Sequence, residues 1–430
     1  MPVVPPVTGP TQPLAKYSVS GSVAGLLGTG LVLQNNAGDD LPITADGTFS
    51  FPVSVTSGDA YAVTVKTQSK ILTRVCTVSN GGGTMGAAAV SNVEVKCAAP
   101  AARFAYTANV FAHNVSAFTI DPVSGALTPM AGGPVAVGTG TGAGAIAVDP
   151  LGRAAYVTDA VASKLFQFNI DRTTGALTPM ASVSVGSGAG LSAIAVEPTG
   201  RFAYAVDSAL EKVWVYAIDA ATGELTNIDK IDTGVFPQSI AVDPLGRFVY
   251  VGNQGENTVS AYAIDADTGL LTALLPAVNA VSQPTYVTVD PAGKNVYVSS
   301  QGTNEVLSYS IGASGALMQT GAKSITPAQS PMGMALDPAG RFAYVTGYLT
   351  GTLQAFAIDA STGLLGTSVL TSVGSRPNSV AIDPLGKFAY VADTNDAKVY
   401  AYRVDSATGL LSNVTQQSTG NGPKAVVLSR

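Results

Sequence analysis

The chain has 430 residues, of which 46% are hydrophobic and 12% are charged, and its formal net charge is −6. This hydrophobic content excludes a disordered chain, and the few scattered Lys and Arg residues exclude a nucleic-acid groove, which needs clustered positive charge. No apolar run reaches the roughly 18 residues of a membrane-spanning helix.

The first hundred residues predict a tail and a small β-sandwich. Residues 1–16 are rich in proline, and residues 17–97 contain strand-like alternation such as that from Tyr61 to Lys66. Residues 98–102 form a short linker. The segment 17–97 resembles the Ig-like domains that precede repeats in secreted bacterial proteins.

Cys76 and Cys97 are the only cysteines, and both lie near the end of this predicted sandwich. We expect a disulfide that joins the last strand to an earlier one. Two buried thiols are the alternative, whereas a metal site would lack the remaining ligands of a tetrahedral shell. The cysteines, the low charge and the abundance of small residues predict an extracellular, periplasmic or outer-surface protein. The first residues lack the charged and apolar parts of an export signal, so we expect that this signal has been removed.

From residue 103 onward the sequence repeats seven times, at spacings of about 46 to 50 residues, which is typical of propeller blades. Each copy contains a basic residue that opens an alternating strand. These residues are Arg103, Arg153, Arg201, Arg247, Lys294, Arg341 and Lys387.

A complete copy predicts four strands, and a turn of the form Asp-Pro-x-Gly joins the first strand to the second. The first copy lacks its initial strand, whereas Pro423–Ser429 matches the initial strand Pro237–Asp243 of a later copy. We therefore expect an all-β fold: a seven-bladed β-propeller over residues 103–430, closed by its C-terminal strand, behind the Ig-like sandwich.

Several residues recur in the copies, and chemistry rarely needs seven copies of one group. We interpret the basic residue after each turn as part of a structural turn that faces a neighbouring blade or solvent, and the tyrosine of the second strand, as in Tyr250, as a contact between blades. The hairpins that begin with Asp171 and Asp265 lack the ligands of a calcium loop, so we interpret them as turns capped by the Asp side chain.

The second strands carry the motifs Ala155–Asp159, Val249–Asn253 and Ala389–Asp393. With these motifs, residues 100–430 resemble bacterial seven-bladed propellers of the lactonase type, which are related to 6-phosphogluconolactonase and to surface-layer propellers with a Tyr-Val-Thr-Asn repeat. The resemblance implies a lactonase-like hydrolase. In such relatives the loop that enters the first strand of a blade often carries a Pro-His pair. Here the corresponding prolines are followed by Gln238, Thr285, Met332, Asn378 and Lys424, so lactone hydrolysis needs another base.

Few residues offer that chemistry. His113 is the only histidine, and the sequence contains no nucleophile elbow, zinc, nucleotide or redox motif, so we expect neither a metal nor a cofactor. The catalytic candidates are Glu211 or Glu256 as base, Arg376 to stabilise the oxyanion, and His113.

The loops at one mouth of the propeller are polar and rich in amides, which suits a carbohydrate or a protein ligand. The predicted ligand-binding residues are Gln238, Asn253, Gln283, Asn378 and Lys424. The sequence therefore favours a binding or structural protein that self-associates through Pro2–Lys16, and the alternative is a hydrolase of a sugar lactone at the channel mouth. Both functions remain open at the level of sequence.

Overall fold

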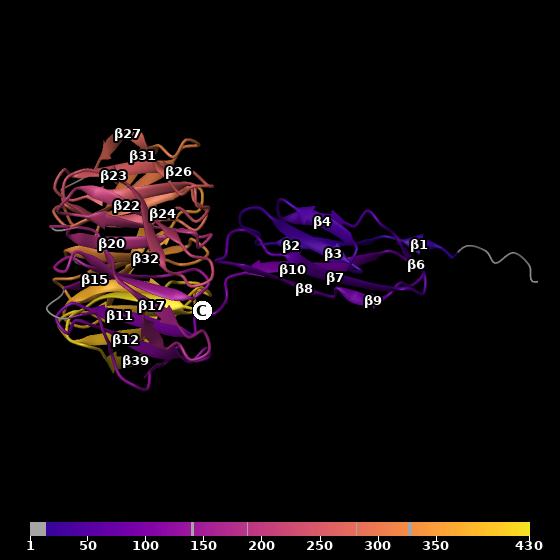
Figure 1. Ribbon diagram of the computed structural model, residues 1–430, viewed down its shortest axis with the longest axis horizontal. Coiled ribbons are helices and arrows are strands. Elements are labelled where there is room, and N and C mark those ends of the chain that lie inside the picture. The colour runs from indigo at the N-terminus through magenta and orange to yellow at the C-terminus, as the bar shows by residue number, and fades with distance from the viewer. Residues whose placement is uncertain (1–13, 139–141, 187, 281, 326–328) are drawn as a thin grey trace, which may run out of the picture. The chain divides into compact units, whose positions relative to one another are not determined.

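The computed structural model describes residues 14–138, 142–186, 188–280, 282–325 and 329–430 (Figure 1). The chain separates into two compact units, Met1–Ala99 and Pro100–Arg430. In the described residues every regular element is a β-strand, and none forms a helix that could span a membrane.

The first unit is a β-sandwich. One sheet has the order β5-β2-β10-β8, a second has the order β4-β3-β7-β9, and β1 pairs with β6. Alternate side chains of both sheets, such as Val23, Leu33 and Val95, are buried in one shared core. The strands are β1 (Lys16–Tyr17), β2 (Val19–Ala24), β3 (Leu31–Asn35), β4 (Asp39–Ile43), β5 (Gly47–Ser50), β6 (Val55–Thr56), β7 (Ala60–Thr67), β8 (Val75–Ser79), β9 (Gly82–Thr84) and β10 (Val90–Ala98).

The predicted disulfide is confirmed. Cys76 of β8 and Cys97 of β10 are directly opposite each other in an antiparallel pair and are joined by a disulfide. Both side chains are buried in the sandwich core, so the cross-link lies inside the unit that it stabilises.

The second unit is a β-propeller. Its described residues form seven sheets, and in each sheet we number the strands outward from the central channel. Blade 1 contains β40 (Pro423–Ser429), β11 (Phe104–Asn109), β12 (Asn114–Ile120) and β13 (Leu127–Pro129), with β14 (Val135–Ala136) beside β12. Blade 2 contains β15 (Ala143–Val148), β16 (Ala154–Asp159), β17 (Lys164–Ile170) and β18 (Leu177–Pro179), with β19 (Val183–Ser184) beside β17.

The remaining five blades each have four strands. Blade 3 contains β20 (Leu191–Val196), β21 (Phe202–Asp207), β22 (Lys212–Ile218) and β23 (Leu225–Asp232). Blade 4 contains β24 (Pro237–Val242), β25 (Phe248–Asn253), β26 (Thr258–Ile264) and β27 (Leu271–Asn279). Blade 5 contains β28 (Pro284–Val289), β29 (Asn295–Ser300), β30 (Glu305–Ile311) and β31 (Leu317–Ser324). Blade 6 contains β32 (Pro331–Leu336), β33 (Phe342–Gly347), β34 (Thr352–Ile358) and β35 (Leu365–Ser372). Blade 7 contains β36 (Pro377–Ile382), β37 (Phe388–Asp393), β38 (Lys398–Val404) and β39 (Leu411–Ser418).

The C-terminal strand closes the ring as the sequence predicts. β40 pairs with β11 in an antiparallel register that places Ser429 opposite Phe104 and Val426 opposite Thr107. In Figure 1 the yellow C-terminal segment lies among the purple first strands of the propeller. The closing strand also contacts the innermost strands on either side, β36 and β15, so the ring of innermost strands is continuous.

The repeated basic residue links neighbouring blades where it is an arginine, whereas no such side-chain bond is seen in the described residues for Lys294 or Lys387. In blade 4 the guanidinium of Arg247 donates to the carboxylate of Asp243 at 2.7 Å and to the carbonyl of Gly293, in the next blade, at 2.9 Å. Arg103 likewise donates to the carbonyls of Arg172 and Thr173 in the next blade. These side chains hold turns together and lie away from the predicted mouth.

A buried tyrosine in the second strand of each blade forms a second link. Its hydroxyl donates to a glycine carbonyl in a hairpin of the following blade, and in blade 7 the following blade is blade 1. The pairs are Tyr106–Gly175, Tyr156–Gly223, Tyr204–Gly269, Tyr250–Gly315, Tyr297–Gly363, Tyr344–Gly409 and Tyr390–Gly125, at 2.6–3.2 Å. Burial raises the pKa of these hydroxyls, so they remain protonated donors.

Candidate functional site

The innermost strands surround a central channel with a cavity volume of about 160 Å³. The second residue of each innermost strand lines it, and five of these residues follow a proline. These seven residues, which we call the channel ring, are Gly144, Ser192, Gln238, Thr285, Met332, Asn378 and Lys424. The channel ring lies near the mouth at which the innermost strands begin and the second strands end, because Pro237 is paired with Asn253 there.

Two hydroxyls of the channel ring are structural. Ser192 donates to the carbonyl of Pro237 at 2.8 Å, and Thr285 donates to the carbonyl of Pro331 at 2.6 Å. Each bond ties one innermost strand to the next. Their hydrogen-bonding capacity is therefore largely used inside the fold.

Three polar side chains of the channel ring have unused hydrogen-bonding groups. Gln238, Asn378 and Lys424 are partly buried, and their side chains form no hydrogen bond or ion pair with any other described residue. A buried polar group normally has a partner, so these groups are available to water or to a ligand. Asn378 and Lys424 come from adjacent blades, and the ring position on the other side of Lys424 is Gly144, which leaves space beside the lysine.

Lys424 is the only charged side chain that lines the described channel. Burial lowers the pKa of its ammonium group, because the charged form loses hydration and none of the described channel-lining residues is a carboxylate that could compensate. This arrangement favours two uses of Lys424: it attracts an anionic group, or it loses its proton more readily than a surface lysine and accepts one during a reaction.

The structure also adds a residue that sequence reasoning missed. Tyr286 lines the channel one position beyond the channel ring, where the other blades have Ala, Ser or Gly. Its hydroxyl forms no hydrogen bond with a described residue, and burial raises its pKa. Tyr286 is the one large side chain among the third residues of the innermost strands. Aligning the repeats at this position would therefore have identified it as a channel-lining residue.

Two predicted catalytic residues occupy a turn position that recurs in all seven blades. His113 and Glu211 are each the fourth residue after a second strand, and both have positive φ, of 51° and 56°. The carbonyls at this position accept a backbone N–H from the end of the same blade, as from Val137 to His113 and from Thr233 to Glu211. The turn therefore explains the conformation of both residues, and neither lines the channel.

The other two catalytic candidates do not meet at the channel either. The side chain of Arg376 lies over the ring of Tyr348 at 5.5 Å, and its backbone N–H donates to Asp393 at 2.8 Å. Among the described residues Arg376 forms no ion pair. Glu256 is exposed and lines a separate cavity at the side of the ring.

The predicted ligand-binding residues divide into two groups. Gln238, Asn378 and Lys424 line the channel together, as described above. Asn253 is fully buried, and its amide donates to Thr258 and Ser260, so it stabilises a turn inside blade 4. Gln283 is an exposed turn residue with a φ of 59° and does not line the channel.

Acidic side chains elsewhere in the propeller cap turns. Asp171 and Asp265 each accept two backbone N–H groups within their own hairpin, and these bonds lower the pKa of both carboxyl groups. In the part of the chain that the structure describes, no group of three or more His, Cys, Asp and Glu side chains could hold a metal ion.

Comparisons with known proteins agree with this geometry. The family described as "Lactonase, 7-bladed beta-propeller" matches residues 59–189, 97–288, 272–380 and 355–428. No curated protein shows detectable sequence similarity to the chain.

Solved structures share the propeller fold. A putative 6-phosphogluconolactonase from Bacteroides uniformis is 19% identical, with 76% of this chain and 99% of that chain covered and a TM-score of 0.67. Another from Bacteroides fragilis is 18% identical, with coverages of 76% and 98% and a TM-score of 0.67. The periplasmic gluconolactonase of Pseudomonas aeruginosa is 17% identical, with coverages of 76% and 99% and a TM-score of 0.65. The family match spans most of the chain, including every blade, and the chain therefore belongs to the lactonase family of seven-bladed β-propellers.

Proposed function

We propose that the propeller hydrolyses a lactone of a polyhydroxylated acid at the mouth of its central channel. The observation that carries this proposal is the channel ring, in which Lys424, Asn378 and Gln238 have free hydrogen-bonding capacity and the lysine has a lowered pKa. Membership of the lactonase family supports the reaction class, and the likeness to structures described as lactonases agrees with it.

The proposed chemistry uses Lys424 as the base. The neutral amine accepts a proton from water while the water oxygen attacks the lactone carbonyl carbon, and amide N–H groups of Asn378 and Gln238 donate to the carbonyl oxygen as it becomes negative. The bond between the carbonyl carbon and the ring oxygen then breaks, and the ring oxygen takes the proton from the lysine ammonium. The product is a hydroxy acid, which ionises and releases one proton to solvent.

The test is turnover of δ-gluconolactone and of 6-phosphogluconolactone, followed by proton release and corrected for spontaneous hydrolysis. Lys424→Met removes the base and should lower kcat/KM by about 10²–10⁴-fold, the usual contribution of a general base. Lys387→Met is the matched control, because Lys387 is exposed in a turn at the opposite mouth and should leave turnover unchanged. Absence of turnover by the wild-type protein on either lactone would contradict the proposal.

A second function is binding without turnover. It is favoured by the absence of a carboxylate among the described channel-lining residues and by the lack of an ion pair between the guanidinium of Arg376 and any described acidic side chain. Under this function the channel binds a carbohydrate or a segment of a protein through the same three side chains. Saturable binding of gluconate or gluconolactam without lactone turnover, lost in Lys424→Met, distinguishes it from hydrolysis.

We further propose that the protein works outside the cytoplasm and that the sandwich is an Ig-like spacer. The disulfide supports this location, because such cross-links persist in oxidising compartments. Self-association through Pro2–Lys16 is part of the same proposal, although residues 2–13 lie outside the described residues. Removal of residues 2–16 should convert oligomers to monomers in light scattering, and an unchanged mass would exclude this role for the tail.

A further inference from the structure

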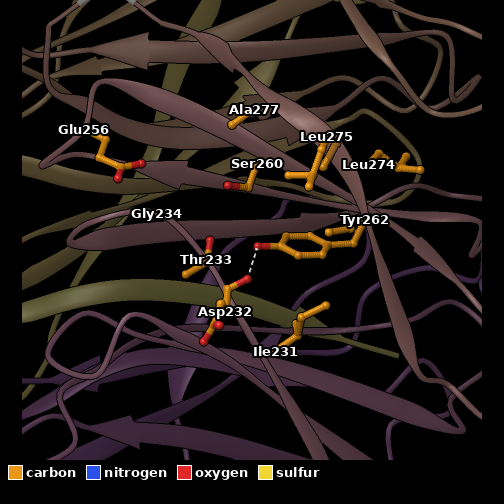
Figure 2. Close-up of a pocket in the computed structure, with 12 residues that line it drawn as sticks. Ile231, Asp232, Thr233, Gly234, Glu256, Ser260, Tyr262, Leu274, Leu275 and Ala277 are labelled. Atoms are coloured by element: carbon orange, nitrogen blue, oxygen red, sulfur yellow. Dashed lines mark hydrogen bonds between the residues drawn. The ribbon is translucent and has the colours of Figure 1, made fainter.

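A second cavity lies between blades 3 and 4, and it shares no lining residue with the central channel. Its volume is about 350 Å³, within the range of small-molecule sites. Its walls come from the end of β23 and the loop after it, from Glu256, and from β26 and β27, as Figure 2 shows. We call it the side cavity.

The outermost strand of blade 4 opens the side cavity. Between Leu274, which is opposite Ala261, and Val278, which is opposite Val259, β27 carries two more residues than β26. The corresponding irregularities of β23, β31, β35 and β39 each carry one extra residue. The larger bulge places Leu275 on the surface, 84% exposed, beside the opening.

A small side chain, that of Ser260, adds to the empty volume of the side cavity. Ser260 is the third residue of β26, where blade 3 has Trp214 and blade 7 has Tyr400. Ser260 accepts a hydrogen bond from Asn253 at 2.8 Å and adds little volume. Blade 2 also has an aromatic residue here, Phe166, whereas blade 4, like blade 1, has a serine. Space that an aromatic ring fills in blades 2, 3 and 7 is therefore left empty in blade 4.

The side cavity has one acidic end and one apolar end. At the first end Glu256 lies beside Gly234 and Thr258, and among the described residues no Lys, Arg or His forms an ion pair with it. At the other end lie Leu274 and Leu275 (Figure 2). Among the described residues no cationic side chain lines the cavity, and the other lining carboxylate, that of Asp232, is already paired with Lys212.

Tyr262 lies in the buried wall of this cavity, with only 2% of its surface exposed. Its hydroxyl donates to the backbone carbonyl of Asp232 at 2.8 Å, as the dashed line in Figure 2 marks. The phenol group is thereby fixed across the boundary between blades 3 and 4. The ring is therefore part of the packed wall, and the apolar surface left to a ligand is that of Leu274 and Leu275.

We propose that the side cavity binds a small organic cation, namely a primary or secondary amine that carries a short aliphatic or aromatic body. The ammonium group pairs with the carboxylate of Glu256, and the apolar body packs on Leu274 and Leu275. An anion would meet uncompensated negative charge. A polyhydroxylated sugar would leave most of its hydroxyls against apolar walls, without partners. The site is independent of the function proposed for the channel.

The probe is 2-phenylethylamine, titrated into the full-length protein by calorimetry at low ionic strength, with the uncharged isostere 2-phenylethanol as the matched ligand. We expect saturable binding of the amine, and binding of the alcohol at least 10-fold weaker. Glu256→Gln should weaken amine binding at least 10-fold, whereas Glu94→Gln, at an exposed carboxylate of the sandwich, should leave it unchanged. Lys424→Met should also leave it unchanged, because the channel is a different site.

Absence of saturable amine binding by the wild-type protein overturns the proposal, as does equal affinity for the amine and the alcohol. Full binding by Glu256→Gln overturns the assigned role of Glu256. Ala277→Trp, which fills the cavity from the bulged strand, provides a second measurement. Binding that survives this substitution would place the amine elsewhere on the protein.

Discussion

Lys424 connects the chemistry of the channel to the stability of the fold. Burial lowers the pKa of its ammonium group in the folded protein, whereas the unfolded chain exposes it to water with an ordinary pKa of about 10.4. Between the two pKa values the unfolded chain binds more protons than the folded chain, so the free energy of unfolding rises with pH across that interval.

Lys424→Met should therefore be more stable than the wild-type protein at pH 7, and this advantage should shrink as the pH rises toward 10. The reason is that the desolvated charge destabilises the folded wild-type protein only while Lys424 is protonated. Urea denaturation of both proteins at several pH values measures the difference. Lys387→Met is the control for the loss of a lysine side chain, because Lys387 is exposed in the folded chain. A constant difference for Lys424→Met would mean that the lysine is not desolvated.

At the scale of the blade, the tyrosine hydroxyls link each sheet to the sheet of the next blade. Tyr156 donates to the carbonyl of Gly223 at 2.6 Å, and both groups lie inside the interface between blades 2 and 3. Tyr156→Phe keeps the ring but leaves that carbonyl without its donor. We expect a loss of about 1–3 kcal/mol in the free energy of unfolding, the cost of an unsatisfied buried acceptor. Thermal and urea unfolding of the variant measure this loss.

Tyr348→Phe is the matched control, because the hydroxyl of Tyr348 forms no hydrogen bond with a described residue. A loss of similar size in both variants would show that the hydroxyl of Tyr156 is not what links the blades. A loss confined to Tyr156→Phe supports a link of the same kind at the other six interfaces.

The repeat explains which structural features were predictable. Aligning the copies predicts the closing strand Pro423–Ser429, the structural role of Arg247 and the interblade role of Tyr250, because every copy has the same geometry. The first copy lacks its own innermost strand, yet its second strand keeps the tyrosine, Tyr106. The structure gives Tyr106 the same bond, to Gly175.

The candidate site was less predictable, because it depends on where single blades depart from the repeat. The channel residues Gln238, Asn378 and Lys424 are predictable from their place after a proline. Glu211 was predicted as a catalytic base, but its position is one whose backbone completes a turn that recurs in every blade. The bulge of β27 has one more unpaired residue than the bulges of the other blades, and this cannot be predicted from the sequence, because strand pairing decides which residues are left unpaired.

At the scale of the whole molecule, the two units have separate cores. The sandwich core contains Cys76 and Cys97, whereas the propeller is stabilised by contacts around its closed ring. The disulfide closes a loop with a sequence separation of 21, which contributes about 3 kcal/mol on the chain-entropy account. A cross-link of this kind acts on the unfolded state of the unit that contains it.

Replacing both cysteines by alanine should therefore lower the melting temperature of the sandwich and leave that of the propeller unchanged. Differential scanning calorimetry should resolve one transition that moves and one that does not, and mild reduction of the wild-type protein should reproduce the shift. Limited proteolysis, in which cleavage shifts to residues 17–97 at intermediate temperature, assigns the moving transition to the sandwich. If both transitions moved together, the two units would unfold as one cooperative body, and the stability of the propeller would depend on a bond that lies wholly outside its ring.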